Sequence, residues 1–188
     1  MTTTAEPKDD ELLRQIADGS EAAFTALFRR WQGPVYRFAL RMCGSPDAAE
    51  EAAQEVFLAV MRQAGRFDPA LGSVSSWLLG MARNQVLRGF EKSARYEALE
   101  DSGPELAGED STPLEDLTRG ERIESLRLAV LALPVKYREV VVLCDLEEAG
   151  YDEAARVIGC PVGTVRSRLS RGRAMLVEKL KSLVGCTV

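Results

Sequence analysis

The sequence predicts an all-α protein built from two small helical domains that are joined by a flexible acidic linker. Apolar residues recur at helical spacing along most of the chain, and no convincing strand pattern is present. A segment rich in acidic residues, Gly, Pro, Ser and Thr interrupts this pattern at 97–120. The pattern then resumes and includes a helix-turn-helix. We therefore predict a flexible tail at 1–8, a first domain at 9–96 and a second domain at 121–184.

Charge is distributed unevenly over the 188 residues. Residues 1–97 carry 12 basic and 13 acidic groups, residues 98–120 carry 1 and 7, and residues 121–188 carry 11 and 9. The net charge of −5 therefore comes mainly from the linker. An acidic chain of this kind can still bind nucleic acid through one of its domains.

Composition argues against a metal site, a cofactor and a membrane span. The chain has no histidine, and its four cysteines, at 43, 144, 160 and 186, form no C-x-x-C pair. We expect Cys43 and Cys144 to be small core residues. The longest apolar run, Leu128–Leu133, is far too short to cross a bilayer. We expect a cytoplasmic protein with reduced thiols, no cofactor and no membrane insertion.

The first domain opens with two helices. The first should run from Asp9 to Asp18, and Ser20 should cap the second. Gly33-Pro34 should bend or interrupt this second helix before it resumes at Val35–Cys43. Ser45 and Pro46 then mark the start of a third helix.

The predicted helix Pro46–Ala64 has two sharply different sides. Small and apolar residues line the side that should be buried. The other side carries Asp47, Glu50, Glu51, Gln54 and Leu58, and its acidic character continues to Glu55. Acids in a first turn can simply stabilise the helix dipole. A basic protein partner is the functional alternative, and residue chemistry alone does not decide between the two.

A loop at 66–73 precedes a helix predicted for Ser75–Arg95. Basic residues alternate with aromatic ones along this helix, a pattern suited to single-stranded nucleic acid. The candidate contacts are Trp77, Arg83, Asn84, Arg88 and Lys92. The alternative is a core tryptophan beside a solvated basic face, with Asn84 making only a local backbone hydrogen bond.

The second domain should contain four helices, of which the last two form the helix-turn-helix at Tyr151–Lys181. Gly159 and Pro161 end the first of these helices. The second helix buries one apolar stripe, and arginines and serines lie opposite that stripe. Such a helix fits the major groove of duplex DNA, where guanidiniums can contact guanine edges. The outward residues are Arg166, Ser167, Ser170 and Arg171.

Two stretches can be compared with known families: CPVGTVRSRLSR with the sequence before it, and SSWLLGMARN with the preceding PDAAEEAAQEVFLAVMR. Together they resemble the extracytoplasmic-function sigma factors, small bacterial subunits that direct RNA polymerase to promoters. The first stretch resembles their region 4, and the second resembles their region 2. The similarity covers nearly everything except the tail and the linker. Two departures stand out: Ala154 replaces a larger aliphatic residue, and Glu148-Ala149-Gly150 replaces the more usual Gly-Leu-Ser.

The resemblance implies a role for each candidate group. The acidic residues Asp47, Glu50, Glu51, Gln54 and Glu55 would dock on the clamp helices of the largest polymerase subunit, and the polymerase flap is a second contact. The helix with Asn84 would hold the single-stranded −10 element, with Asn84 at an extruded base. Arg166, Ser167, Ser170 and Arg171 would read the −35 duplex, with Thr164, Arg168 and Arg173 on phosphates. An anti-sigma factor is an implied further partner.

Two other functions remain as alternatives. A stand-alone helix-turn-helix regulator would bind duplex DNA without polymerase, usually as a dimer. It would leave the acidic helix and the Trp77–Asn84 stretch without a role. An enzyme is disfavoured, because the chain has no histidine and no nucleophile–base arrangement.

Overall fold

The computed structural model describes residues 7–97 and 119–184, and all regular structure in these two ranges is helical. The predicted flexibility of the linker and of most of the tail falls outside these ranges. The predicted linker boundaries, 97 and 120, need a small correction. Helix α4 continues through Glu97, and α5 already begins at Arg119.

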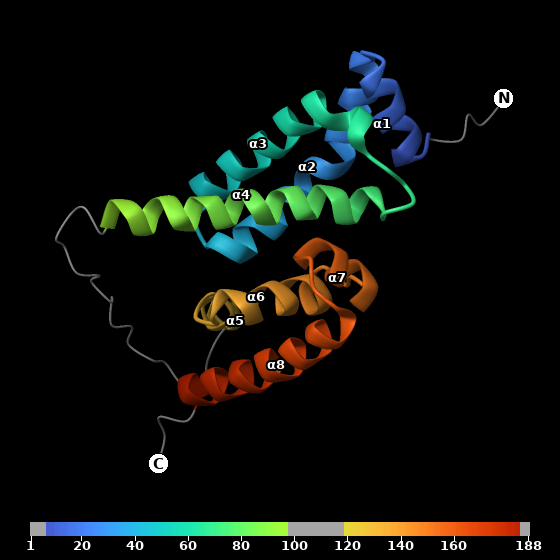
Figure 1. The fold of residues 1–188 in the computed structure, drawn as a ribbon. Coiled ribbons are helices and arrows are strands. Elements are labelled where there is room, and N and C mark those ends of the chain that lie inside the picture. Colours follow the sequence, from blue (N-terminus) through green and yellow to red (C-terminus); the bar gives the residue numbers. More distant parts are fainter. Residues whose placement is uncertain (1–6, 98–118, 185–188) are drawn as a thin grey trace.

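The first domain packs four helices around one core. They are α1 (Asp9–Ala17), α2 (Glu21–Cys43), α3 (Pro46–Gln63) and α4 (Val74–Glu97). A short 3-10 turn, η1 (Ala64–Arg66), and a loop connect α3 to α4. Helices α2, α3 and α4 pack against one another, and α1 covers one end (Figure 1).

Serine caps fix where two of these helices begin. The Ser20 side chain accepts a hydrogen bond from the Ala23 amide at 3.2 Å, and Ser45 accepts one from Ala48 at 3.3 Å. Gly44 ends α2 with a φ of 77°, in the left-handed region that favours glycine. The predicted helix boundaries around 20 and 45 are therefore confirmed.

Of the two predicted effects of Gly33-Pro34, an interruption is wrong, because α2 is one helix with Pro34 inside it. An internal proline removes a backbone hydrogen bond and costs about 3 kcal/mol. Here Leu27 lies before the proline and Phe38 after it, and both are completely buried. Burial of large apolar side chains on both sides of Pro34 offsets that cost.

The second domain contains α5 (Arg119–Leu131), α6 (Val135–Val141), α7 (Tyr151–Ile158) and α8 (Val162–Val184). Between α6 and α7 the chain widens into a π-helical segment, η3 (Val142–Leu146), which the sequence pattern did not predict. Alpha-helical and π-helical turns can bury the same apolar residues, so periodicity does not distinguish them.

The helix-turn-helix is confirmed. Gly159 ends α7 with a φ of 74°, and α8 begins three residues later at Val162. The α8 stripe is buried at Val165, Leu169 and Gly172, as predicted. At Gly172 a Cβ would lie only 2.9 Å from a Val141 methyl, so glycine allows α8 to approach α6 closely.

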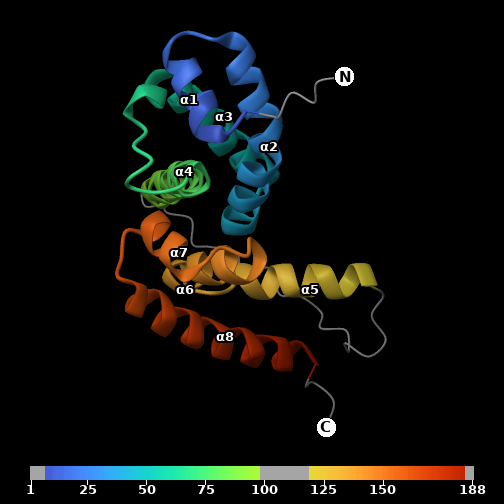
Figure 2. The same ribbon diagram turned by 90° about the vertical axis from the view of Figure 1, so that its right-hand side faces the viewer.

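The two domains pack against each other, which the sequence did not suggest. Helix α4 lies along α7, and the C-terminal end of α2 contacts α5, α6 and η3 (Figures 1 and 2). Buried residues of both domains join in one hydrophobic cluster. Both views place α8 on the side of the second domain that faces away from the first. None of the helices in 7–97 or 119–184 combines the length and hydropathy that a membrane span requires.

Candidate polymerase and nucleic-acid interfaces

The acidic residues of α3 lie on an exposed face. Asp47, Glu50, Glu51, Gln54 and Glu55 are all exposed, and their four carboxylates form no ion pair with any basic residue that the structure describes. The same helix also exposes the apolar side chains of Leu58 and Met61. The sequence predicted the position of Leu58 but missed Met61, whose i+3 spacing from Leu58 was the available signal.

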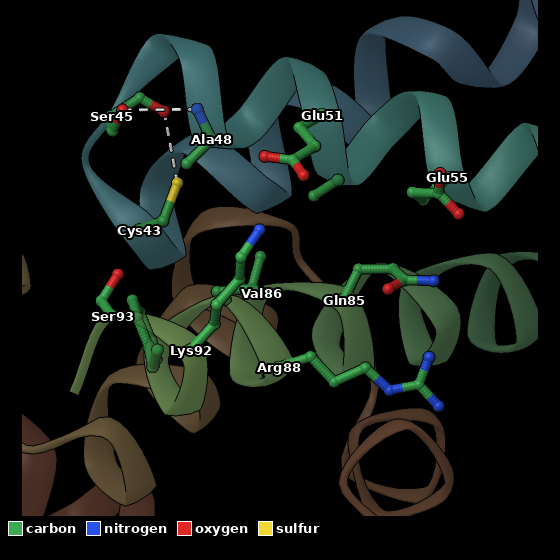
Figure 3. A pocket seen from close by; sticks show the side chains of 13 residues that line it. Cys43, Ser45, Ala48, Glu51, Glu55, Gln85, Val86, Arg88, Lys92 and Ser93 are labelled. Atoms are coloured by element: carbon green, nitrogen blue, oxygen red, sulfur yellow. Dashed lines mark hydrogen bonds between the residues drawn. The ribbon is translucent and has the colours of Figure 1, made fainter. Parts of the chain in front are cut away.

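A groove of about 500 Å³ separates α3 from α4. Glu51 and Glu55 line its α3 side, and Arg88 and Lys92 line its α4 side. Figure 3 shows Lys92 directed toward the start of α3, whereas Arg88 turns away from α3. The structure therefore places predicted polymerase contacts and predicted −10 contacts on opposite walls of one groove.

A second hollow, of about 350 Å³, lies at the N-terminal half of α4. It is lined by the 66–73 loop, by Trp77 and by Asn84. Trp77 is half-buried, with its ring centroid 5.6 Å from that of Phe67. Asn84 is exposed, and its side chain makes no hydrogen bond to any described residue. The local backbone hydrogen bond considered from the sequence is therefore absent in this part of the chain.

Arg83, a predicted −10 contact, is paired with an acid of the second domain in this structure. Its Nε donates a hydrogen bond to Glu139 Oε2 at 2.8 Å, and its side chain is only 18% exposed. Glu139 belongs to α6 of the second domain. In this conformation Arg83 therefore contributes to domain packing, because its hydrogen bond to the carboxylate is charge-assisted and therefore strong.

The predicted reading residues of α8 are exposed. Arg166, Ser167, Ser170 and Arg171 all face solvent, opposite the buried stripe. The Arg166 guanidinium lies over the Tyr151 ring, 5.5 Å from its centroid. The Ser167 hydroxyl donates to the carbonyl of Thr164 at 3.0 Å. This face can contact a DNA groove without moving the helix.

Two of the three predicted phosphate contacts on α8 are held by acids of their own domain. Arg168 donates to Glu139 Oε1 at 3.2 Å, and Arg173 donates to both oxygens of Asp145, at 3.0 and 2.5 Å. The hydrogen bond to Asp145 raises the pKa of Arg173 above its ordinary value. The third, Thr164, is half-buried. Arg173 remains about half exposed, whereas Arg168 is turned inward.

Glu139 was missed by the sequence reasoning. Its carboxylate is 3% exposed and accepts hydrogen bonds from Arg83 and Arg168 together. The signal was its helical spacing, because Val142 and Leu143, three and four residues later, are fully buried. A glutamate on that stripe must be buried, and a buried carboxylate needs cationic partners.

Three of the four cysteines lie in the residues that the structure describes. Cys43, Cys144 and Cys160 are half-buried free thiols, and burial raises the pKa of Cys43 and Cys144. A raised thiol pKa lowers the thiolate fraction and therefore the reactivity. In residues 7–97 and 119–184 no group of three or more His, Cys, Asp or Glu side chains could hold a metal ion.

Comparison with known proteins identifies the family. Residues 27–96 match the family model described as Sigma-70 region 2, and residues 123–176 match the one described as Sigma-70, region 4. The ECF RNA polymerase sigma factor SigE of Mycolicibacterium smegmatis is 34% identical over 183 residues, which cover 93% of this chain and 70% of SigE. The chain belongs to the ECF RNA polymerase sigma factors.

Other similarities agree with this assignment. ECF sigma factor SigM of Mycobacterium tuberculosis is 33% identical over 178 residues, covering 93% of this sigma factor and 86% of SigM. The fold resembles that of RpoE of Bartonella quintana, which was solved with the anti-sigma factor NepR. The TM-score is 0.70 and the identity 24%, and the match covers 84% of this chain and 96% of RpoE. CnrH, solved with the cytosolic domain of CnrY, gives a TM-score of 0.68 and 24% identity. This match covers 93% of this chain and 97% of CnrH.

These findings confirm the predicted family, fold class and function. The chain is an alternative sigma factor, which acts with core RNA polymerase on promoter DNA, and the stand-alone regulator is not supported. They do not assign these functions to individual residues.

Proposed function

We propose that three exposed surfaces of this sigma factor each serve one partner. The acidic face of α3 docks on core polymerase, the hollow at Asn84 takes an unpaired base of the −10 element, and the outer face of α8 reads the −35 duplex. All three surfaces are exposed in the structure. Their different chemistry, acidic, polar-aromatic and basic, suits three different partners.

The polymerase contacts follow from charge and exposed apolar area. Four unpaired carboxylates flanked by Leu58 and Met61 fit a basic helical partner, which we propose to be the clamp helices of the largest subunit. In the second domain, Ile123, Leu126 and Val177 are exposed large apolar side chains on the neighbouring helices α5 and α8. We propose that the polymerase flap covers them.

The environment of Asn84 is the observation that carries this proposal. An amide offers both a donor and an acceptor, so it can pair with the Watson–Crick edge of one base. Extruding a base costs a few kcal/mol, which stacking and hydrogen bonds must offset. Trp77 and Phe67 supply aromatic surface in the same hollow, and Asn84 has no described partner that it would need to give up.

Run-off transcription with core polymerase tests this assignment. The promoter is first identified by sequencing the transcripts made from genomic DNA, and each −10 position is then varied over the four bases. Asn84→Ala should reduce open-complex formation, and the loss should depend on the base at a single −10 position. The isosteric Asn84→Asp loses the donor and should shift the preferred base at that position.

Gln63→Ala is the matched control, because Gln63 is an exposed amide on α3 outside this hollow. It should transcribe as the parent does. Thermal stability and core binding should be close to parental in all three variants. A uniform loss across all bases, or a loss of folding in Asn84→Ala, would return Asn84 to a structural role.

We also infer three broader properties. The protein acts in the cytoplasm, where RNA polymerase lies, and it is not an enzyme. An anti-sigma factor regulates it, as suggested by the two structural neighbours solved with protein partners, one of them named as an anti-sigma factor.

A further inference from the structure

Asp145 binds one edge of the Arg173 guanidinium. Arg173 Nε donates to Asp145 Oδ2 at 3.0 Å, and Arg173 Nη2 donates to Oδ1 at 2.5 Å. Both carboxylate oxygens are therefore engaged by one guanidinium, in the parallel two-bond geometry that makes an arginine–carboxylate pair both strong and directional. Asp145 belongs to the π-helical segment η3, so the contact connects the chain before the helix-turn-helix to α8.

The other edge of the same guanidinium is unused. The group has five N–H donors, one on Nε and two on each terminal nitrogen. Asp145 takes the Nε donor and one Nη2 donor, and no described residue accepts from the remaining three. One Nη1 donor and the second Nη2 donor are parallel and form a second fork. The Arg173 side chain is 54% exposed, so this fork is open to an anion from solvent.

Arg138 provides a contrast within the second domain. It donates to main-chain oxygens, among them Met42 O at 2.5 Å and Leu133 O at 3.1 Å, and it connects helix ends. The pair of Arg173 with Asp145 lies instead on the surface, where an ion pair contributes little to stability. Its main effect is therefore to fix where the guanidinium of Arg173 points.

Arg173 lies at the edge of the proposed reading face. The proposed base contacts, at 166, 167, 170 and 171, occupy the first half of α8, and Arg173 follows them. A recognition helix contacts base edges mainly through its N-terminal residues. A straight helix then leaves the groove toward the sugar–phosphate wall. An arginine at this position meets phosphate, which sets the register of the helix but carries no sequence code.

We propose that Asp145 is a positioning residue that increases the sequence specificity of −35 binding through Arg173. It aims the free fork of Arg173 at one phosphate, so the fork fits only when α8 lies in the correct register. Its negative charge also cancels the attraction that an uncompensated arginine has for any duplex. Both effects weaken binding to wrong sequences more than binding to the cognate element. This inference rests on the proposed −35 surface of α8.

Holoenzyme binding to labelled −35 duplexes tests the proposal. Fluorescence anisotropy compares the cognate element with a scrambled one between about 50 and 200 mM salt. Asp145→Asn keeps the size of the side chain and removes its charge. Its affinity for the scrambled duplex should rise about fivefold, and log affinity should fall more steeply with log salt, by about 0.9. The cognate affinity should change by less than about twofold, so the ratio of cognate to scrambled affinity falls.

Two further variants control this experiment. Asp152→Asn removes an exposed acid in the first turn of α7 that forms no ion pair with a described residue, and it should leave the ratio unchanged. Arg173→Ala should weaken binding to both duplexes alike. Adding Asp145→Asn to Arg173→Ala should then leave the ratio unchanged, because the side chain that Asp145 positions is gone. Thermal unfolding should be close to parental in every variant.

Three outcomes overturn the role of Asp145. They are a parental ratio in Asp145→Asn, an equal fall of the ratio in Asp152→Asn, and a fall that persists when Arg173 is alanine. The second outcome would mean that loss of any nearby negative charge suffices, and the third that Asp145 does not act through Arg173. If neither Arg171→Ala nor Arg173→Ala weakens cognate binding, the proposed −35 surface itself is wrong. Weak binding by Arg173→Ala with a parental ratio in Asp145→Asn rejects Asp145 alone.

Discussion

The charged surfaces of the two domains differ in how they are held. On α8, Arg166 lies over Tyr151 and Arg173 binds Asp145, both within the second domain. In the first domain, the acidic side chains of α3 and the basic pair Arg88 and Lys92 of α4 have no ion-pair partner among the described residues. Two arginines of α8 are therefore held in place, whereas these charged side chains of α3 and α4 are not.

This difference corresponds to the partners proposed for each surface. A duplex presents base edges and phosphates at fixed positions, so side chains ordered in advance lose less entropy on binding. A melted strand is flexible, and freely rotating side chains can follow it. We infer that the ordered side chains of α8 serve to read the duplex sequence. The freely rotating side chains of the first domain serve to bind the flexible melted strand.

The largest effect should come from reversing free charge in the first domain. Glu51→Lys together with Glu55→Lys should weaken core polymerase binding by about 100-fold or more, because like charges brought together cost several kcal/mol. The affinity is measured by fluorescence with labelled sigma factor. Glu11→Lys with Asp18→Lys, two exposed acids on or beside α1, is the control and should bind normally. Equal affinities of the two double variants would refute the docking assignment.

Two helix glycines provide a contrast in packing. A Cβ at Gly172 of α8 would lie 2.9 Å from Val141 and 3.3 Å from the Tyr137 carbonyl, whereas a Cβ at Gly89 of α4 would meet nothing within 4 Å. Gly172→Val should destabilise the protein by about 2–3 kcal/mol through overpacking. Gly89→Ala should stabilise it by up to about 1 kcal/mol through helix propensity. Urea unfolding measures both, and equal shifts would contradict the contrast.

Arg171 tests the reading surface of α8 directly. Arg171→Ala should cost about 1–3 kcal/mol on the cognate −35 element and relax specificity at one base pair. The measurement compares holoenzyme binding to promoters with cognate and scrambled −35 sequences. Arg173→Ala is the comparison, because a phosphate contact should weaken binding to both sequences alike. If Arg171→Ala affects both sequences equally, direct reading by Arg171 is wrong.

Backbone strain in the second domain gives a smaller effect. Glu148 has a φ of 55°, in the left-handed region that favours glycine. Glu148→Gly should stabilise the protein by about 1 kcal/mol, because glycine adopts this conformation without a Cβ clash. Equilibrium unfolding measures the gain. Glu153 lies in the regular helix α7, so Glu153→Gly should destabilise instead, and a gain in both would exclude the φ argument.

The smallest predicted effect concerns the ring below Arg166. Tyr151→Leu removes the cation–π contact and should weaken cognate −35 binding by about 0.5–1 kcal/mol. Tyr151→Phe keeps the ring and should bind as the parent does. Anisotropy with a labelled −35 duplex and holoenzyme measures both. A similar loss in the two variants would assign the effect to the hydroxyl rather than to ordering of Arg166.

Local patterns predicted much of the fold. The Gly159 turn, the Ser20 and Ser45 caps and the α8 stripe depend on residues close together in the chain, and all are confirmed. The helix is not interrupted at Pro34, because burial on both sides of it outweighs its local cost. Tertiary packing of this kind leaves no short-range signal.

The candidate sites show the same division. The exposure of Asn84, Arg166 and Arg171 follows from helical spacing alone. The partners of Arg83 and Arg168 could not be predicted, because the former contact spans 56 positions and the latter 29. An arginine on a helix surface looks the same in sequence whether it meets phosphate, water or a distant glutamate.

All hydrogen bonds from Arg138 go to main-chain oxygens, at the C-terminal end of α2 and at the end of α5. Besides Met42 O, it donates to Leu133 O at 3.1 Å and to Leu131 O, and its guanidinium lies over the Phe90 ring at 5.9 Å. Burial lowers the pKa of this guanidinium, and its Nε has no described partner. Every residue type has a carbonyl, so exchanges at 42, 131 or 133 do not remove an acceptor.

The consequence concerns which positions can vary during evolution. In a library selected only for folding, 131 and 133 should accept any apolar side chain of similar volume. Position 138 should refuse even lysine, whose single ammonium cannot replace a planar fork that donates in several directions. The contact between these helix ends therefore depends on the residue type at position 138 alone. The positions that accept its hydrogen bonds do so with the main chain, so their residue type hardly matters for this contact.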